Sequence, residues 1–158
     1  MTAEQKREFQ QSMGAQFSQD RIYRYALWRS WNQQEGHVMF IGLNPSTADE
    51  TKDDPTIRRC IGYAKQWGYG GIYMLNIFAY RCTNPRELYD CLVDPCGSEN
   101  NSFLLKYAKS ASKIIAGWGN NGKLCRRGEL ITDMIIEETN RLMEWLGITK
   151  NGEPKHPL

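Results

Sequence analysis

The sequence predicts a single α/β domain with a three-layer α/β/α arrangement, in which helices cover both faces of a mostly parallel central sheet. Two short apolar runs, at 38–41 and 72–79, are typical of strands that are buried on both faces. Segments with apolar residues at three- and four-residue spacing follow these runs, and alternating strands and helices favour right-handed βαβ units. The chain has 158 residues, of which 41% are hydrophobic, so it can bury one core.

The first part of the chain is expected to hold an arm and two strands. Residues 1–20 are polar and rich in glutamine, and we expect a polar N-terminal arm that is loose or partly helical, followed by the α/β domain at 21–158. Residues 22–31 alternate between two faces, which predicts a strand. A polar turn at 32–36 would lead from it, as a hairpin, into a buried strand at 37–43.

A helix and a second buried strand are expected next. Asp54 suits an N-cap and Pro55 suits the first helical position. Apolar residues then recur at helical spacing from Ile57 to Trp67, which predicts one buried helix face. Glycines end this helix, and the strand at 72–79 follows.

The C-terminal half is expected to continue the alternation. A short helical turn is expected at 85–90 and a longer helix from Ser98. The third buried strand is expected at 113–116. The last helix is expected from Ile131 to Trp145, and a short strand or extended tail from Ile148.

Composition narrows the class of protein. The formal net charge is +2, which does not predict a large electrostatic surface for duplex DNA. No apolar run reaches about 18 residues, so no membrane span is expected. The N-terminus lacks the apolar stretch of a signal peptide, which favours a cytoplasmic location. The five cysteines form no Cys-x-x-Cys pair and there are two histidines, so we expect neither a metal site nor a cofactor.

The loop after the first buried strand is the leading candidate for a ligand site. Ligands of open parallel sheets bind outside the carboxyl ends of the strands. Glycine allows a close approach of the backbone, proline fixes a turn, and asparagine offers both a donor and an acceptor. A plain structural turn would use the same residues. The candidate residues are Gly42, Leu43, Asn44, Pro45, Ser46 and Thr47.

The loops after the second and third buried strands supply the other candidates. An asparagine in an apolar strand needs hydrogen-bond partners, so Asn76 is either a satisfied structural amide or a reader of a base edge. The glycines and Lys123 after the third strand could bind an anion at a helix N-terminus. The candidates are Asn76, Phe78, Tyr80 and Arg81 in one loop, and Trp118, Gly119, Asn120 and Lys123 in the other.

Charged residues outside these loops complete the list. Asp54 belongs to an acidic cluster that caps the helix or, less simply, positions a water molecule or holds Mg²⁺ with a phosphate. Arg58 and Arg59 are candidates for phosphate binding. His156 near the C-terminus is either a solvated surface residue or a catalytic one.

The loops resemble those of the uracil-DNA glycosylase superfamily, above all its mismatch-specific branch. The run from Val38 to Ser46 is similar to a strand leading into a Gly-x-Asn-Pro-Gly loop, with Ser46 where glycine is usual. Asn76 to Arg81 is similar to a segment after the second strand of other branches, and Lys155 to Leu158 to the start of a His-Pro-Ser loop. The resemblance implies a uracil-DNA-glycosylase-like fold in which Asn44 helps to position the hydrolytic water.

A longer stretch, from Arg24 to Leu158, resembles a bacterial and phage family called domain of unknown function 1643. The shared motifs include Arg-Tyr-x-Leu-x-Arg at 24–29, Asn-Pro-Ser-Thr-Ala-Asp at 44–49 and Asp-Asp-Pro-Thr-Ile-Arg-Arg at 53–59. This resemblance implies a shared fold and says little about activity.

Two functions are therefore expected as alternatives. The first is hydrolysis of an N-glycosidic bond in a modified base, a nucleotide or single-stranded DNA. Asn44 would orient water, Asn76 would read the base edge, and His156 would stabilise the departing base. Tyr80 or Trp118 would stack on the base. The second is a non-catalytic nucleotide-binding protein, for example a phage protein that sequesters a host nucleotide signal and so counters host defence.

Overall fold

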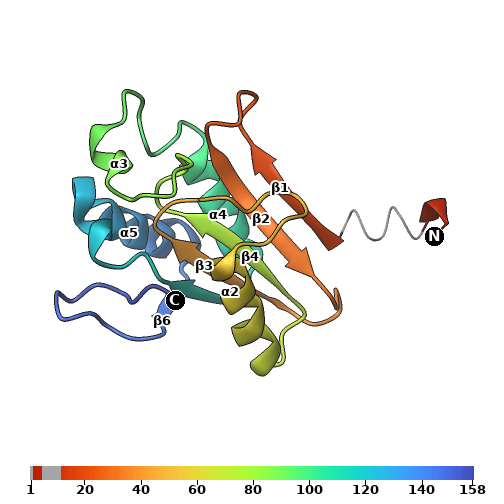
Figure 1. The fold of residues 1–158 in the computed structure, drawn as a ribbon. Helices are drawn as coiled ribbons and strands as arrows, with labels where there is room; N and C mark the ends of the chain where they lie inside the picture. The colour runs from red at the N-terminus through yellow and green to blue at the C-terminus, as the bar shows by residue number, and fades with distance from the viewer. Residues whose placement is uncertain (1, 5–11) are drawn as a thin grey trace.

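Six strands form one sheet in the computed structural model, which describes residues 2–4 and 12–158 of the chain (Figure 1). In chain order they are β1 (Met13–Phe17), β2 (Arg24–Ser30), β3 (His37–Gly42), β4 (Gly71–Asn76), β5 (Lys113–Ala116) and β6 (Glu144–Trp145). Their order across the sheet is β1-β2-β4-β3-β5-β6. The pairs β3–β4, β3–β5 and β5–β6 are parallel, whereas β1–β2 and β2–β4 are antiparallel. The sheet is mixed and mostly parallel.

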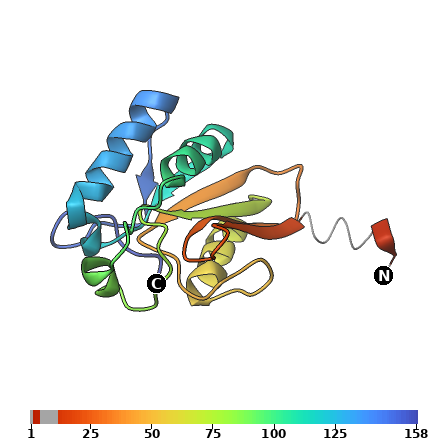
Figure 2. The same cartoon turned by 90° about the horizontal axis from the view of Figure 1, so that it is seen from above.

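Helices lie against both faces of this sheet. They are α2 (Pro55–Gln66), α3 (Glu87–Asp90), α4 (Asn100–Ser110) and α5 (Arg127–Thr139), with a 3₁₀ helix η1 (Asn120–Arg126) before α5. Figure 2 shows α2 on one face and α4 with α5 on the other. Alternate residues of β3 divide between the two cores, since Phe40 packs with residues of α2, and Ile41 with residues of α4 and α5. This is the α/β class that the sequence predicts.

The start of α2 has the predicted capping. Asp54 is the N-cap, and its Oδ1 accepts a hydrogen bond from Ile57 N at 2.9 Å. Pro55 is the first helical residue, where its missing N–H costs nothing. Within the described residues, no helix has the length and apolar character needed to cross a bilayer.

Three expectations about the elements are corrected. The hairpin between the strands at 22–31 and 37–43 does not form, because β4 lies between β2 and β3. The expected arm at 1–20 includes an edge strand at Met13–Phe17, since the free edge of β2 offers backbone partners there; residues 1 and 5–11 lie outside the described part of the chain. The last helix ends at Thr139, because Asn140 takes a left-handed conformation that caps it.

Candidate functional site

The segment between β3 and α2, residues 43–54, crosses the carboxyl edge of the sheet on its α2 side (Figures 1 and 2). We call it the β3–α2 loop. Arg29 of β2 is 4% exposed and its guanidinium holds the end of this loop. It donates to the carbonyl oxygens of Asp49 at 2.7 Å and Glu50 at 3.2 Å, and to Asp53 Oδ1 at 2.8 Å. Charge-assisted bonds of this kind fix the loop to the sheet.

Arg24 reaches the same loop because β2 carries a bulge. Gln16 is opposite Ala26, but the next residue, Phe17, is opposite Arg24, so Tyr25 is the extra residue. The extra residue of a bulge changes the face of the sheet to which the side chains before it point. Arg24 is therefore on the face of the sheet that packs against α2, and its Nη1 donates to Ala48 O at 3.2 Å.

The β3–α2 loop, the loop after β4 and residues that precede β2 line a cavity of about 460 Å³ that is wide open to solvent. Ligand pockets span roughly 300–1,000 Å³, so the volume suits a small organic ligand. Two guanidinium groups, an aromatic ring and hydroxyl groups face it. The residues that carry them are Arg21, Ser46, Thr47, Tyr80, Arg81 and Thr83. We call this space the edge cavity.

The two arginines of the edge cavity differ in their partners. Arg21 forms an exposed ion pair with Glu50, with Nη1 and Oε1 2.6 Å apart. Arg81 donates from Nη1 to the backbone oxygen of Arg21 at 3.2 Å, and its guanidinium lies 4.7 Å from the centre of the Phe17 ring. Among the described residues, Arg81 has no carboxylate within ion-pair distance. Its positive charge is therefore available to a ligand.

Asn44 ties the two loops together. Its Nδ2 donates to Cys82 O at 2.8 Å and to Pro45 O at 3.1 Å. Within residues 2–4 and 12–158, its Oδ1 takes part in no hydrogen bond. The side chain therefore has a structural role through its nitrogen, and its oxygen can still accept a hydrogen bond from water or a ligand.

Asn76 lies at the end of β4 and is 2% exposed. It is paired with Gly42 across the parallel β3–β4 ladder. A Cβ on Gly42 would lie 2.7 Å from Asn76 Oδ1, so the asparagine side chain needs glycine at this position. Asn76 Nδ2 is buried and has no hydrogen-bond partner among the described residues.

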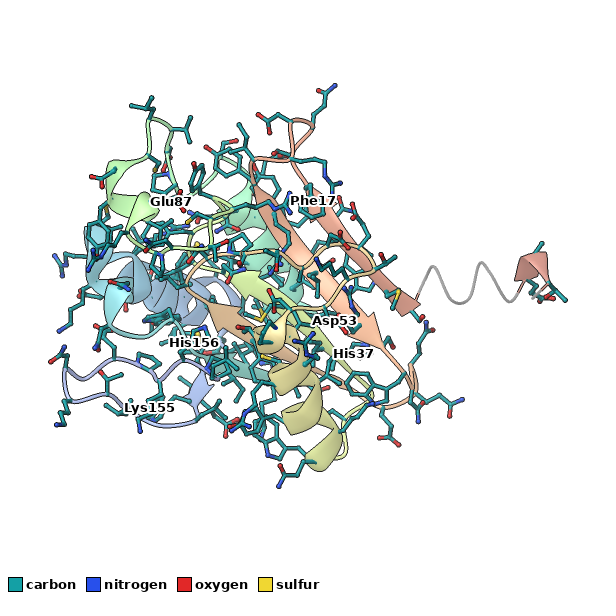
Figure 3. The ribbon with its side chains drawn as sticks, viewed as in Figure 1. Phe17, His37, Asp53, Glu87, Lys155 and His156 are labelled. Carbon is teal, nitrogen blue, oxygen red and sulfur yellow. The ribbon has the colours of Figure 1, made fainter. Side chains whose placement is uncertain are left out.

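The charge of Asp54 acts on His156, which is about 100 residues later in the sequence. The C-terminus lies on the α2 side of the sheet, where Pro157 packs against Gly117, and His156 is labelled in Figure 3. The His156 side chain is exposed to solvent overall, but neighbouring residues partly desolvate its ring and lower its pKa, and the negative charge of Asp54 opposes this shift. His156 Nδ1 accepts a hydrogen bond from Leu158 N at 3.2 Å.

The turn after β5 does not contribute to the edge cavity. Trp118 is 4% exposed, packs in the core, and donates from Nε1 to Glu153 Oε2 at 3.1 Å. Asn120 Oδ1 accepts from Thr149 at 2.6 Å, and Lys123 donates to Asn151 O at 3.1 Å. The structure therefore places Trp118, Asn120 and Lys123 away from the edge cavity, with hydrogen bonds to residues 149–153.

The helix geometry after β5 also differs from the expectation of an anion site at a helix N-terminus. Gly119 and Asn120 lead into the 3₁₀ helix η1, and α5 begins only at Arg127. Gly119 N donates to Pro154 O at 2.8 Å. The glycine amide is therefore committed as well.

Other predicted ligand residues lie in the core or on another surface. Phe78 is fully buried and Leu43 is 7% exposed, and both pack in the core on the α4–α5 side, so neither is a contact surface for a ligand. Arg58 and Arg59 are exposed on α2 and line a separate space of about 410 Å³. The arginines of α2 are thus not part of the edge cavity.

The sequence reasoning missed Arg21, Arg24 and Arg29 as parts of the site. A signal was present, because Arg24 and Arg29 interrupt an otherwise apolar strand, and a buried charge requires partners. Their partners are separated from them by about 20 or more residues, so sequence alone does not identify them. Across the described ranges, no group of three or more His, Cys, Asp or Glu side chains comes together as metal ligands would.

Comparison with known proteins gives one match. A family model described as "Protein of unknown function (DUF1643)" matches residues 24–158. Neither the curated proteins nor the solved structures contain a significant match.

Proposed function

The chain belongs to the DUF1643 family, and from its geometry we propose that it binds a nucleobase or nucleotide in the edge cavity. The observation that carries the proposal is the meeting of two loops, after β3 and after β4, around one cavity with cationic, aromatic and hydroxyl groups. The helices on both sheet faces support a uracil-DNA-glycosylase-like three-layer arrangement as part of the same proposal. Open parallel sheets bind ligands outside the carboxyl ends of their strands, where the edge cavity lies.

Each wall of the edge cavity suits a different part of a nucleotide. Tyr80 is half-buried and presents a flat ring on which a base can stack. Ser46 and Thr47 offer hydroxyl groups to a sugar, and Arg81 offers a guanidinium to a phosphate. The ligand is a free nucleotide, or a nucleotide of single-stranded or modified DNA. Without turnover, the protein would act by sequestering a host nucleotide signal.

A second candidate function, hydrolysis of an N-glycosidic bond, is favoured by the uncommitted Oδ1 of Asn44. Asn44 would orient a water molecule toward the anomeric carbon of the sugar. A new C–O bond would form there as the C–N bond breaks, with its electron pair leaving on the base. A proton from the water would finally reside on the base, and His156 would stabilise the departing base.

Binding is tested by thermal shift and calorimetry with nucleobases, nucleosides and nucleotides. A ligand of the folded state raises the melting temperature. Tyr80→Leu should weaken the affinity of a bound base by about fivefold or more, since stacking contributes roughly 1–3 kcal/mol per base. Tyr89→Leu is the matched control, because Tyr89 is 54% exposed on α3. If no base, nucleoside or nucleotide binds, or if both variants behave alike, the proposal is wrong.

Turnover is tested by incubating the protein with nucleotides and with single-stranded oligonucleotides that carry uracil or modified bases. Chromatography then measures released base. Base release that Asn44→Ala abolishes, in a variant that remains folded, would support hydrolysis. A ligand recovered intact at one per chain would support binding alone.

A further inference from the structure

Three buried nitrogen atoms at the carboxyl edge of the sheet have no hydrogen-bond partner among the described residues. They are Arg24 Nε, Arg81 Nε and Asn76 Nδ2; one more buried atom without a partner, Asn100 Oδ1, is an acceptor on α4. More than nine in ten buried polar groups in proteins are paired, so three such atoms at one edge need an explanation. All three are donors. The partner that they lack is therefore an acceptor.

Arg24 at the same edge is a buried cation with no ion pair among the described residues. Arg24 is 2% exposed, and its Nη1 bonds to a neutral carbonyl, Ala48 O. Asp54 favours the charged form of Arg24, whereas Arg81 and Arg29 disfavour it. Burial lowers the pKa of Arg24 to about 10, so the guanidinium still carries its charge at neutral pH. A buried cation without an ion pair is costly, and an anion would balance it.

Arg24 begins β2 and Asn76 ends β4 at the same edge of the sheet, and Arg81 lies in the loop that follows β4. The bulge at Tyr25 turns Arg24 toward the α2 side, and Asn76 faces that side together with Met74. Arg24 N donates to Ala79 O at 3.0 Å, which places Arg24 against the chain that leads to Arg81. Arg81 in turn lines the edge cavity. Of the three residues only Arg81 lines the edge cavity, and Arg24 and Asn76 are each 2% exposed.

We propose that Arg24, Arg81 and Asn76 form an anion subsite beside the edge cavity, which binds the phosphate group of a phosphorylated nucleoside. This inference rests on the proposed function and deepens it, because it states that the ligand carries a phosphate. A phosphate offers several acceptor oxygens to the three unpaired donors, and its charge balances the two guanidiniums. Arg58 and Arg59, on a separate surface, are then not the phosphate ligands.

Calorimetry distinguishes a phosphate subsite from base recognition alone. The probes are the four common ribonucleoside 5′-monophosphates, the corresponding nucleosides, and inorganic phosphate. We expect at least one monophosphate to bind about tenfold or more tightly than its nucleoside. Arg81→Gln should weaken that monophosphate by about ten- to a hundredfold and the nucleoside by less than about threefold, because hydrogen bonds to charged groups are the strong ones. Arg59→Gln, the same change on α2, should leave both affinities unaltered.

Inorganic phosphate tests the subsite without the rest of the ligand. At equal ionic strength, phosphate should raise the melting temperature of the wild type and of Arg59→Gln above the values in chloride, but not that of Arg81→Gln. Phosphate should also fail to raise the melting temperature of Arg24→Gln. If Arg24→Gln does not fold, the comparison of Arg81→Gln with Arg59→Gln decides the test.

The outcomes separate the two proposals. If nucleosides bind as tightly as monophosphates and phosphate has no specific effect, the subsite is wrong and base binding stands. If phosphate stabilises the protein through Arg81 but no nucleoside or nucleotide binds, the subsite stands and the proposed function is wrong.

Discussion

Two turns of this chain follow buried parallel strands and carry the same residue types, yet the structure uses them differently. Gly42 ends β3 and Asn44 lies in the turn that follows it, and the turn after β5 contains Gly119 and Asn120. In the first, Asn44 Oδ1 remains uncommitted and a cavity opens beside the loop. In the second, the asparagine, the lysine and the indole nitrogen all bond to residues 149–153. The first turn keeps a polar atom uncommitted, and the polar groups of the second support residues 149–153.

The difference lies in the segment that covers each turn. The C-terminal segment supplies a carboxylate, a hydroxyl and a carbonyl to the turn after β5, and so satisfies its polar groups. The β3–α2 loop is instead held at its far end by Arg24 and Arg29 of β2, which donate to Ala48 O and Asp49 O and do not reach Asn44 Oδ1. A polar turn is thus available to a ligand where the segment that covers it leaves some of its polar groups uncommitted.

The comparison predicts first that Trp118→Ala destabilises the fold without removing ligand binding. Truncating a buried tryptophan costs about 3–5 kcal/mol, and Trp118 is 4% exposed. Denaturant unfolding measures the loss, and ligand affinity is measured under conditions where the variant is folded. We expect the affinity to change by less than about threefold.

Trp145→Ala is the control for this prediction. Trp145 is 56% exposed in β6, so its truncation should cost less than about 1 kcal/mol. If Trp118→Ala abolishes ligand binding in the folded protein, the turn after β5 belongs to the site and the contrast between the two turns is wrong.

The second prediction concerns the contact between Gly42 and Asn76. In Gly42→Ala the new Cβ would lie 2.7 Å from Asn76 Oδ1 and 2.8 Å from Met74 Cε, so side chains must move. Overpacking of this kind costs about 1–3 kcal/mol. We expect a lower free energy of unfolding together with weaker ligand binding, because Asn76 is displaced.

Gly62→Ala is the control for Gly42→Ala and should have the opposite effect on the free energy of unfolding. Gly62 lies inside α2 and a Cβ there meets nothing within 4 Å. Alanine should stabilise the helix by about 0.5–1 kcal/mol. Equal effects of the two substitutions on unfolding would contradict the close approach of Asn76 to β3.

Much of the fold could be predicted because local patterns determine it. The apolar runs gave β3, β4 and β5, and Asp54 with Pro55 gave the start of α2 to the residue. The order of strands was not predictable in the same way. Nothing local in the run at 22–31 says that its neighbour is β4 rather than β3, since pairing depends on which edge of the sheet remains open.

The candidate site was predictable only in part, for a related reason. Ser46, Thr47, Tyr80 and Arg81 follow the ends of β3 and β4, and the topology of a parallel sheet brings such residues together. The role of Arg24 depends on a one-residue bulge, and the burial of Trp118 depends on a C-terminal segment about 35 residues away. Neither feature leaves a periodic pattern in the sequence.

The smallest expected effect is on the pKa of His156, and it tests whether the C-terminal segment also reaches the β3–α2 loop. Partial desolvation holds this pKa below the ordinary value of 6.5, while the charge of Asp54 raises it. Asp54→Asn removes the charge and keeps a good N-cap, so the pKa of His156 should fall further in a folded protein. NMR titration of the imidazole measures it.

The lowered pKa of His156 also makes the free energy of unfolding depend on pH. Because the folded-state pKa of His156 is lowered, the unfolded state binds the proton more strongly. The contribution of His156 to stability is therefore complete above about pH 6.5 and is lost as the pH falls through the folded-state pKa. His37, which is half-buried at the start of β3, also has a lowered pKa. The pH dependence of the free energy of unfolding is therefore measured in His37→Gln, where the contribution of His37 is absent. An unchanged His156 titration in Asp54→Asn would mean that the C-terminal segment does not sense the start of α2, and would leave His156 outside the site.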